Sequence, residues 1–256
     1  MIPLALTASL CTFSPGQVRT YDLVDETAGA YPMPPGTSVA GDGGFSWTVA
    51  AQLRVEVVAV DDDGLDLRLQ FSDASVTSAM PETTLAQAAV LSVTTPLEVR
   101  YDRNPGMIRP SNPQAWAETF GAALRVPGVS DTDAQAATAA YAPTIATGLV
   151  TTYVVPLFSH SCRDFTVGRT EHPMLEPDTG SVVTDVTAPN GGLRVQIISE
   201  SRPPMPDGQA GTVRAVGDVV LGADGWTTLS TWSVHSQLAG TRFRQSRSLK
   251  LRPPAE

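Results

Sequence analysis

Apolar and polar residues alternate with a period of two along most of this chain, which restricts it to strands that bury one face. Residues 52–71, QLRVEVVAVDDDGLDLRLQF, show the pattern on both sides of a DDDG turn. They predict an antiparallel hairpin whose turn has Gly64 at positive φ. The aspartates at 61–63 are consecutive, whereas a calcium loop spaces its carboxylates by two residues, so we interpret them as turn residues.

The same alternation recurs in further stretches and predicts nine to eleven strands in all. These stretches are QVRTYDL, GFSWTVA, PLEVRYDRNPGMI, GGLRVQIIS, GDVVLGADGWTTLSTWSV and TRFRQSRSLKLRP. Two of them contain turn sequences, at residues 104–106 and 224–225. Strands joined in this way favour an antiparallel sheet.

The middle of the chain, residues 112–156, follows a helical pattern instead. An Asn-Pro pair caps its start, and Trp116 and Phe120 lie one helical turn apart. A second helix is predicted to begin at Ser130 and to end at Pro156. We therefore predict an α+β fold, mainly β, in which a bent antiparallel sheet (a half-barrel) wraps a central helical insert.

The N-terminal residues 1–11, MIPLALTASLC, are either the remnant of a leader or the first strand of the fold. Residues 12–256 are predicted to form a single β-rich domain that carries the helical insert. No stretch reaches the roughly 20 apolar residues of a membrane-spanning helix, so no transmembrane span is predicted.

Charge is unevenly distributed along the 256 residues. The net charge is −9, so the surface repels phosphate backbones and nucleic acid is not an expected partner. Residues 226–255, in contrast, contain no acidic residue. Their basic residues pair with acidic neighbours inside the fold or contact an anionic partner, such as a lipid headgroup, a glycan or an envelope protein. They are Arg242, Arg244, Arg247, Lys250 and Arg252.

Cys11 and Cys162 are the only two cysteines. One disulfide between distant cysteines is typical of an extracytoplasmic protein, whether periplasmic, attached to the cell envelope or secreted. Closing so long a loop removes about 4–5 kcal/mol of unfolded-state entropy in the simple chain model. Two unrelated buried thiols are the alternative.

The helical insert is rich in alanine, so it fills space loosely and leaves room for an apolar molecule between the sheet and the helices. Large side chains from both layers are the candidates for lining such a site. They are Trp47, Phe71, Trp116, Phe120, Tyr141, Trp226 and Trp232. For the tryptophans at 116, 226 and 232, and for Phe120, a place in the hydrophobic core is the alternative.

Three pieces of the chain, FSPGQVRTYDL, TTYVVPLFSHSCRDFTVGR and GDVVLGADGWTTL, carry a resemblance in their order. The chain resembles the bacterial lipoprotein-carrier-like half-barrels of the cell envelope. It is also similar to a group of secreted bacterial proteins that begin pG-x-x-x-x-Y and have a helical middle followed by a closing hairpin. The resemblance implies an envelope location and an apolar, lipid-like ligand. It transfers no catalytic residue.

The three histidines, His160, His172 and His235, form with Cys162 the candidate metal site, which would suit copper or zinc. The spacing H-x-C puts His160 and Cys162 on one face of a predicted strand, whereas His172 precedes a proline in a predicted loop. Histidines that bind no metal are the alternative.

No nucleotide-binding loop and no G-x-S-x-G sequence occurs, so we predict no cofactor and no catalytic residue. The sequence favours a secreted or envelope-associated, non-enzymatic protein that binds an apolar, lipid-like ligand between sheet and helices. The first alternative is a structural or accessory subunit of a cell-surface assembly, which binds an envelope protein through strand edges and the basic last strand. The second is a small Cu/Zn metalloenzyme that uses the three histidines.

Overall fold

The computed structural model describes residues 12–30, 44–78, 96–103, 107–116, 118, 130, 132, 136, 143–161, 165–173, 179–189, 192–203, 211–238 and 241–253. The strands of this part of the chain form one antiparallel sheet. They are β1 (Val18–Ala30), β2 (Gly44–Val60), β3 (Gly64–Ser78), β4 (Leu97–Asp102), β5 (Met107–Pro110), β6 (Gly168–Pro173), β7 (Thr179–Thr187), β8 (Leu193–Arg202), β9 (Thr212–Leu221), β10 (Thr227–Leu238) and β11 (Thr241–Leu251). The prediction of a mainly β, antiparallel fold is confirmed.

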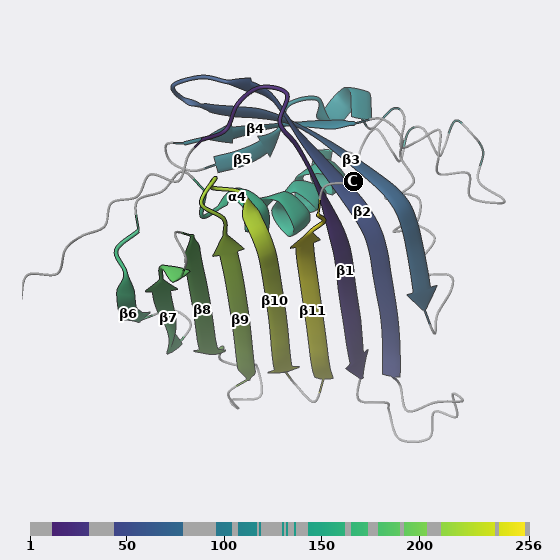
Figure 1. The fold of residues 1–256 in the computed structure, drawn as a ribbon. Helices are drawn as coiled ribbons and strands as arrows, with labels where there is room; N and C mark the ends of the chain where they lie inside the picture. The colour runs from purple at the N-terminus through teal and green to yellow at the C-terminus, as the bar shows by residue number, and fades with distance from the viewer. Residues whose placement is uncertain are drawn as a thin grey trace, which may run out of the picture.

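The order of the strands places the first and the last at the centre of the sheet. That order is β5-β4-β3-β2-β1-β11-β10-β9-β8-β7-β6. The first five strands therefore run outward from β1 as one meander, and the last six return inward to β11. β1 and β11 pair with each other and so join the two meanders. Their pairing is continuous from Tyr21–Leu251 to Ala30–Arg242. Figure 1 shows the strands as one open, curved layer with the helical segment on one side of it.

The helical segment connects the two meanders. Its described residues include helix at 113–116 and 143–149, followed by the π-helix η1 (Val150–Val154) and by α4 (Val155–Phe158). Most of residues 117–142 lies outside the described residues, so the full helical insert stays a prediction. Within the part of the chain that the structure describes, no helix combines the length and the hydropathy needed to cross a membrane.

The prediction that Pro156 ends the helix is wrong. This proline lies in the first turn of α4, where a missing N–H is tolerated. The carbonyl of Thr152, one helical turn earlier, accepts a hydrogen bond from Nη1 of Arg247 at 2.9 Å instead. The helix continues to Phe158, and the N–H of Ser159 donates to Val155 O at 2.8 Å.

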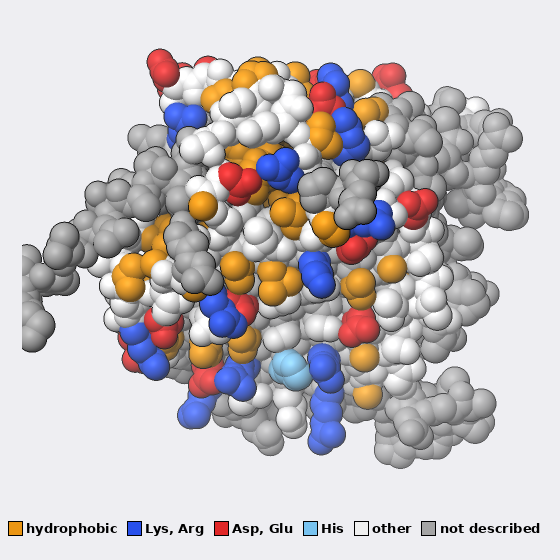
Figure 2. Space-filling view, viewed as in Figure 1, with side chains coloured by type: hydrophobic (Ala, Val, Ile, Leu, Met, Phe, Trp, Pro, Cys, Tyr) orange, Lys and Arg blue, Asp and Glu red, His pale blue; other side chains and the backbone are white. Residues whose placement is uncertain are grey.

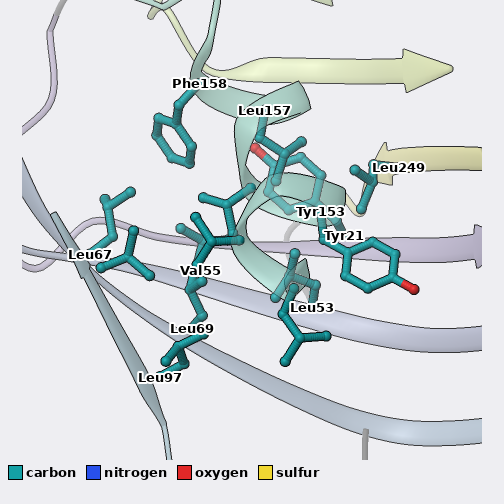
Figure 3. Packing of buried hydrophobic residues seen from close by; sticks show 14 of the residues in the cluster. Tyr21, Leu53, Val55, Leu67, Leu69, Leu97, Tyr153, Leu157, Phe158 and Leu249 are labelled. Carbon is teal, nitrogen blue, oxygen red and sulfur yellow. The ribbon is translucent and has the colours of Figure 1, made fainter. Parts of the chain in front are cut away.

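The main hydrophobic core lies between the helical segment and the sheet. In Figure 3, Tyr153, Leu157 and Phe158 of the helical segment pack toward leucines of the strands. We call the side of the sheet that carries these contacts the helix face, and the opposite side the outer face. A second, smaller cluster lies farther along the helix face and comprises Val186, Leu193, Val195, Val219 and Leu221.

The turn between β2 and β3 has the predicted position but not the predicted backbone. Gly64 does not adopt positive φ. Glycine is needed at this position because the Cβ of any other residue would overlap the carbonyl oxygen of Tyr101 on β4. Asp61 closes the turn, since its Oδ1 accepts hydrogen bonds from the N–H groups of Asp63 and Gly64 at 2.9 and 2.7 Å. Its carboxylate also pairs with Arg100 Nη2 at 2.7 Å. These aspartates are therefore turn residues, as expected.

Candidate functional site

The structure shows a pocket of about 920 Å³ where the ends of β7 to β11 and β1 lie side by side. Its described lining comes from six neighbouring strands and from no helix. The lining residues are Ala28, Gly29, Ala30, Gly180, Ser181, Glu200, Ser201, Arg202, Thr212, Val213, Arg214, His235, Ser236, Gln237, Arg242, Phe243 and Arg244.

These residues fall into three adjacent rows that cross the strands. The middle row consists of directly paired residues, one from each strand: Gly29, Phe243, Ser236, Val213, Ser201 and Gly180. Along β1 and β11 this row is an even number of residues from the buried pair Leu23–Leu249, so its side chains lie on the helix face. The rows on either side of it therefore present their side chains to the outer face.

The pocket is a groove on the outer face. A pocket on the helix face would also touch the next row there, yet Thr27, Gln245, Val234, Ala215 and Ser199 do not line it. The main chain of the middle row instead forms a floor, and the two outward rows form the walls. One wall contains Ala28, Arg244, His235, Arg214, Glu200 and Ser181, and the other contains Ala30, Arg242, Gln237, Thr212 and Arg202.

Basic side chains are concentrated along this outer groove. His235 is paired directly with Arg244 on one side and with Arg214 on the other, so three basic residues stand in a row across three strands. At the end of this row Arg214 Nε lies 3.1 Å from Glu200 Oε1, and both side chains are exposed. Figure 2 shows basic side chains and a histidine gathered near the lower ends of the strands on this face.

The groove is electropositive although the chain as a whole is acidic. The described lining residues include four arginines and one glutamate, which give a formal charge of +3 with neutral histidine, whereas the whole chain carries −9. Such a local concentration of positive charge attracts anions and discriminates between ligands by charge.

The remaining lining groups are small or polar. The floor offers few hydrogen-bonding groups to a ligand, because all of its residues except Gly180 of β7 lie on strands that are paired with neighbours on both sides there. The walls add hydroxyls and amides from Ser181, Thr212 and Gln237, and among their described residues the only apolar side chains are the alanines at 28 and 30. A ligand held here is therefore recognised by charge and by hydrogen bonds to side chains.

Seven aromatic residues were predicted to bind an apolar ligand, and none of the five that the structure describes lines this groove. Phe71, Trp116 and Trp226 are buried in the main core, and Trp226 packs edge-on against Phe13 with ring centroids 4.9 Å apart. Trp47 is half-buried and stacks on Phe45. The half-buried Trp232 lies against Gly217, where a Cβ would come within 2.5 Å of its ring. Phe120 and Tyr141 lie outside the described residues.

The five basic residues of the last strand divide into three groups. Arg242 and Arg244 line the groove. Arg247 is on the helix face and pairs with Asp25, with Nη2 2.8 Å from Oδ2, and Arg252 pairs with Asp22 at 3.3 Å. Lys250 lies on the outer face but outside the groove. Sequence reasoning missed Arg202, Arg214 and the role of His235 beside them, because only the register between strands brings them together.

The structure does not bring together His172 and His235, two of the predicted metal ligands, and Cys162 lies outside the described residues. His172 lies on the edge strand β6 and not in a loop, while His235 lies on β10, with three strands between them. His160 lies in a turn after α4 and not on a strand, and its Nδ1 is 2.7 Å from Ser159 Oγ. Among the described residues, no three His, Cys, Asp or Glu side chains are placed to hold a metal ion.

Both cysteines lie outside the described residues, but the residues next to them bind the same turn. Thr12 Oγ1 donates to Asp224 O at 2.9 Å, and Ser161 Oγ donates to Gly225 O at 3.1 Å. This turn between β9 and β10 was predicted at these positions, and its Gly225 has φ +80°. The chain neighbours of Cys11 and Cys162 thus converge on two consecutive carbonyls.

Comparison with known proteins adds no identity to this chain. No protein-family model matches it, and no curated protein matches it.

Proposed function

We propose that this protein is a non-enzymatic, extracytoplasmic binding protein whose outer-face groove holds an anionic partner. One observation carries the proposal: Arg244, His235 and Arg214 form an uninterrupted basic row in a groove of an otherwise acidic chain. A concentration of positive charge on an otherwise acidic chain is explained by an anionic partner that neutralises it.

The proposed extracytoplasmic location and the proposed half-barrel architecture rest on the same resemblance. We propose a half-barrel that wraps the helical insert of residues 112–156, in the envelope or secreted, as the resemblance to carrier-like proteins implies. A disulfide between Cys11 and Cys162 fits this location. Its support is that Thr12 and Ser161, next to the two cysteines, bond to adjacent residues of one turn.

The groove favours the role of an accessory subunit with an anionic contact over that of an apolar carrier. The described aromatic residues proposed for an apolar ligand pack into the core or lie away from the groove. The arginines at 242 and 244, proposed for an anionic contact, line the groove.

The experiment is a binding titration with dextran sulfate at two salt concentrations. We expect binding that weakens with salt, because exposed charges are screened. The variant Arg242→Gln/Arg244→Gln should lose binding, and the control Lys250→Gln/Arg169→Gln, which removes the same charge from exposed sites outside the groove, should keep it. Equal binding by both variants would show that net charge and not the groove attracts the polymer.

A further inference from the structure

We infer that His235 makes the groove sensitive to pH, so that it binds its anionic partner more tightly in mildly acidic than in mildly alkaline solution. This inference rests on the proposed function and adds the regulation of the same site.

His235 is the middle member of the basic row. On β10 it is paired directly with Arg244 of β11 on one side and with Arg214 of β9 on the other. Directly paired residues have Cβ atoms about 5 Å apart. His235 is exposed and belongs to one wall of the groove. A partner that contacts the arginines on both sides therefore lies over the imidazole ring.

Charged residues on four neighbouring strands surround His235 on the outer face. In the described part of the chain they are Arg242 and Arg244 on β11, Arg214 on β9, Glu200 and Arg202 on β8, and Glu26 on β1. The two carboxylates are each two strands away from the histidine. Glu200 pairs with Arg214 at 3.1 Å, and Glu26 accepts a hydrogen bond from Ser246 Oγ at 3.1 Å.

The charge of the groove changes at His235 when the pH varies around neutrality. Arginine titrates far above this range and carboxylic acids titrate below it, whereas histidine titrates within it. Four arginines and one glutamate give the described lining a charge of +3, and the imidazolium raises it to +4. The added charge stands between the two flanking arginines, where an anion contacts the row.

Anion binding and protonation of His235 favour each other. A bound anion stabilises the charged form of an imidazole beside it, because opposite charges attract. Linkage makes the effect reciprocal, so a protein with protonated His235 binds the anion more tightly by the same factor. Binding therefore takes up protons, and the affinity rises as the pH falls through the range in which histidine titrates.

His172 provides a matched control outside the groove. It is exposed on the edge strand β6, where its paired residue is Val182 of β7, and it does not line the groove. A histidine at this position adds the same charge to the protein at low pH, but it adds it away from the basic row. Comparing the two histidines thus separates an effect of the groove from an effect of net charge.

The test measures binding of dextran sulfate to the whole chain at pH 5.5 and at pH 8.0, at one ionic strength. The sulfate groups stay ionised at both values, so only the protein changes its charge. The unmodified protein should bind about fivefold more tightly at pH 5.5, the gain expected from one exposed charge contact. His235→Gln should bind equally at both values, His235→Lys should bind tightly at both, and His172→Gln should keep the fivefold difference.

Proton uptake gives a second, independent measurement. Titration calorimetry near pH 6.5 in two buffers of different ionisation enthalpy counts the protons that are taken up when dextran sulfate binds. We expect a fraction of one proton for the unmodified protein and for His172→Gln. His235→Gln should take up none.

Failure of the inference and failure of the proposed function are distinguishable. Equal affinity of the unmodified protein at the two pH values, or a pH dependence that persists in His235→Gln, would overturn the inference and leave the anionic partner in place. Absence of binding at both pH values, or full binding by Arg242→Gln/Arg244→Gln, would overturn both.

Discussion

Asp25 on the first strand and Arg247 on the last form a buried ion pair 222 residues apart in the chain. Arg247 Nε and Nη2 lie 2.9 and 2.8 Å from Asp25 Oδ2. The Arg247 side chain is only 13% exposed and that of Asp25 only 7%. The same guanidinium donates to the carbonyl of Thr152 and stands over the ring of Tyr153, 5.2 Å from its centroid. One residue therefore ties both central strands to the helical segment.

Breaking this pair should destabilise the fold strongly. Arg247→Met leaves a carboxylate buried without its partner and the Thr152 carbonyl without its donor, so we expect a loss of about 3–5 kcal/mol in the free energy of unfolding. Asp22→Asn, which breaks the exposed pair with Arg252 between the same two strands, should cost less than about 1 kcal/mol. Urea denaturation measures both. Similar losses in the two variants would mean that burial adds nothing to the pair.

Two fully buried tyrosines should respond in opposite directions to loss of the hydroxyl. The hydroxyl of Tyr21 has no hydrogen-bond partner in the described structure, whereas that of Tyr101 donates to Ser161 O at 3.0 Å. Tyr21→Phe removes an unpaired buried polar group and should raise stability by about 1 kcal/mol. Tyr101→Phe should lower it by about 1–2 kcal/mol, because Ser161 O loses its donor. Thermal denaturation of both variants checks the signs.

Stability should fall at alkaline pH. Burial, reinforced by the carboxylate of Asp25, raises the pKa of Tyr153 from 10.0 to about 12. The folded protein therefore keeps this proton more tightly than the unfolded chain does. The stabilisation is complete below pH 10 and is lost as the pH rises through 12. Burial also raises the pKa of Tyr21, which acts in the same direction.

Unfolding curves measured from pH 8 to pH 12 test this dependence. Tyr153→Phe should reduce the slope above pH 10, by at most about 1.4 kcal/mol for each pH unit. The double variant Tyr21→Phe/Tyr153→Phe should flatten it further. An unchanged slope in the double variant would exclude both tyrosines as its cause.

Two glycines should respond in opposite ways to a methyl group. Gly64→Ala places a Cβ against the main-chain carbonyl of Tyr101, which cannot move without disturbing the pairing of β3 and β4, so we expect a loss of about 1–3 kcal/mol. Gly148 lies in the helical segment, and a Cβ there would meet no atom within 4 Å beyond the helix's own backbone. Gly148→Ala should therefore raise stability by about 1 kcal/mol. Equilibrium unfolding in urea compares the two.

The proposed disulfide has a direct test. Intact mass under non-reducing, denaturing conditions should be two hydrogens lighter than after reduction, and a non-reduced digest should contain one peptide pair that joins Cys11 to Cys162. Bond formation is expected because the neighbouring Thr12 and Ser161 are held on one turn. Two thiols that both react with iodoacetamide before reduction would contradict it.

The strands were predictable wherever one face is buried, and less so elsewhere. The hairpin of β2 and β3 buries every second residue over most of its length, so its alternation is visible in the sequence. Edge strand β6 is exposed at all of its residues, so it carries no alternation, and His172 was wrongly expected in a loop. Glycine at position 64 was predicted correctly as a turn residue but for the wrong reason, because the carbonyl of Tyr101 comes from another strand.

The groove depends on register, which the sequence reveals only in part. Two residues separate Leu238 from its partner Thr241, and this short connection already places His235 opposite Arg244. The pairing of β9 with β10 instead shifts by one residue between Thr227 and Leu229. That bulge brings Arg214 opposite His235. Neither its presence nor its position is marked by alternation, so the basic row could not be found from the sequence.

The central position of the first and last strands has a consequence for how the chain acquires its structure. The β1–β11 pairing joins residues more than 200 positions apart, so it adds strongly to the contact order and forms only when the last strand is available. During synthesis the first meander can assemble by hairpins while its central edge stays unpaired. The pairing that joins the two meanders therefore comes last, and until then the backbone groups along the central edge of β1 have no partner strand.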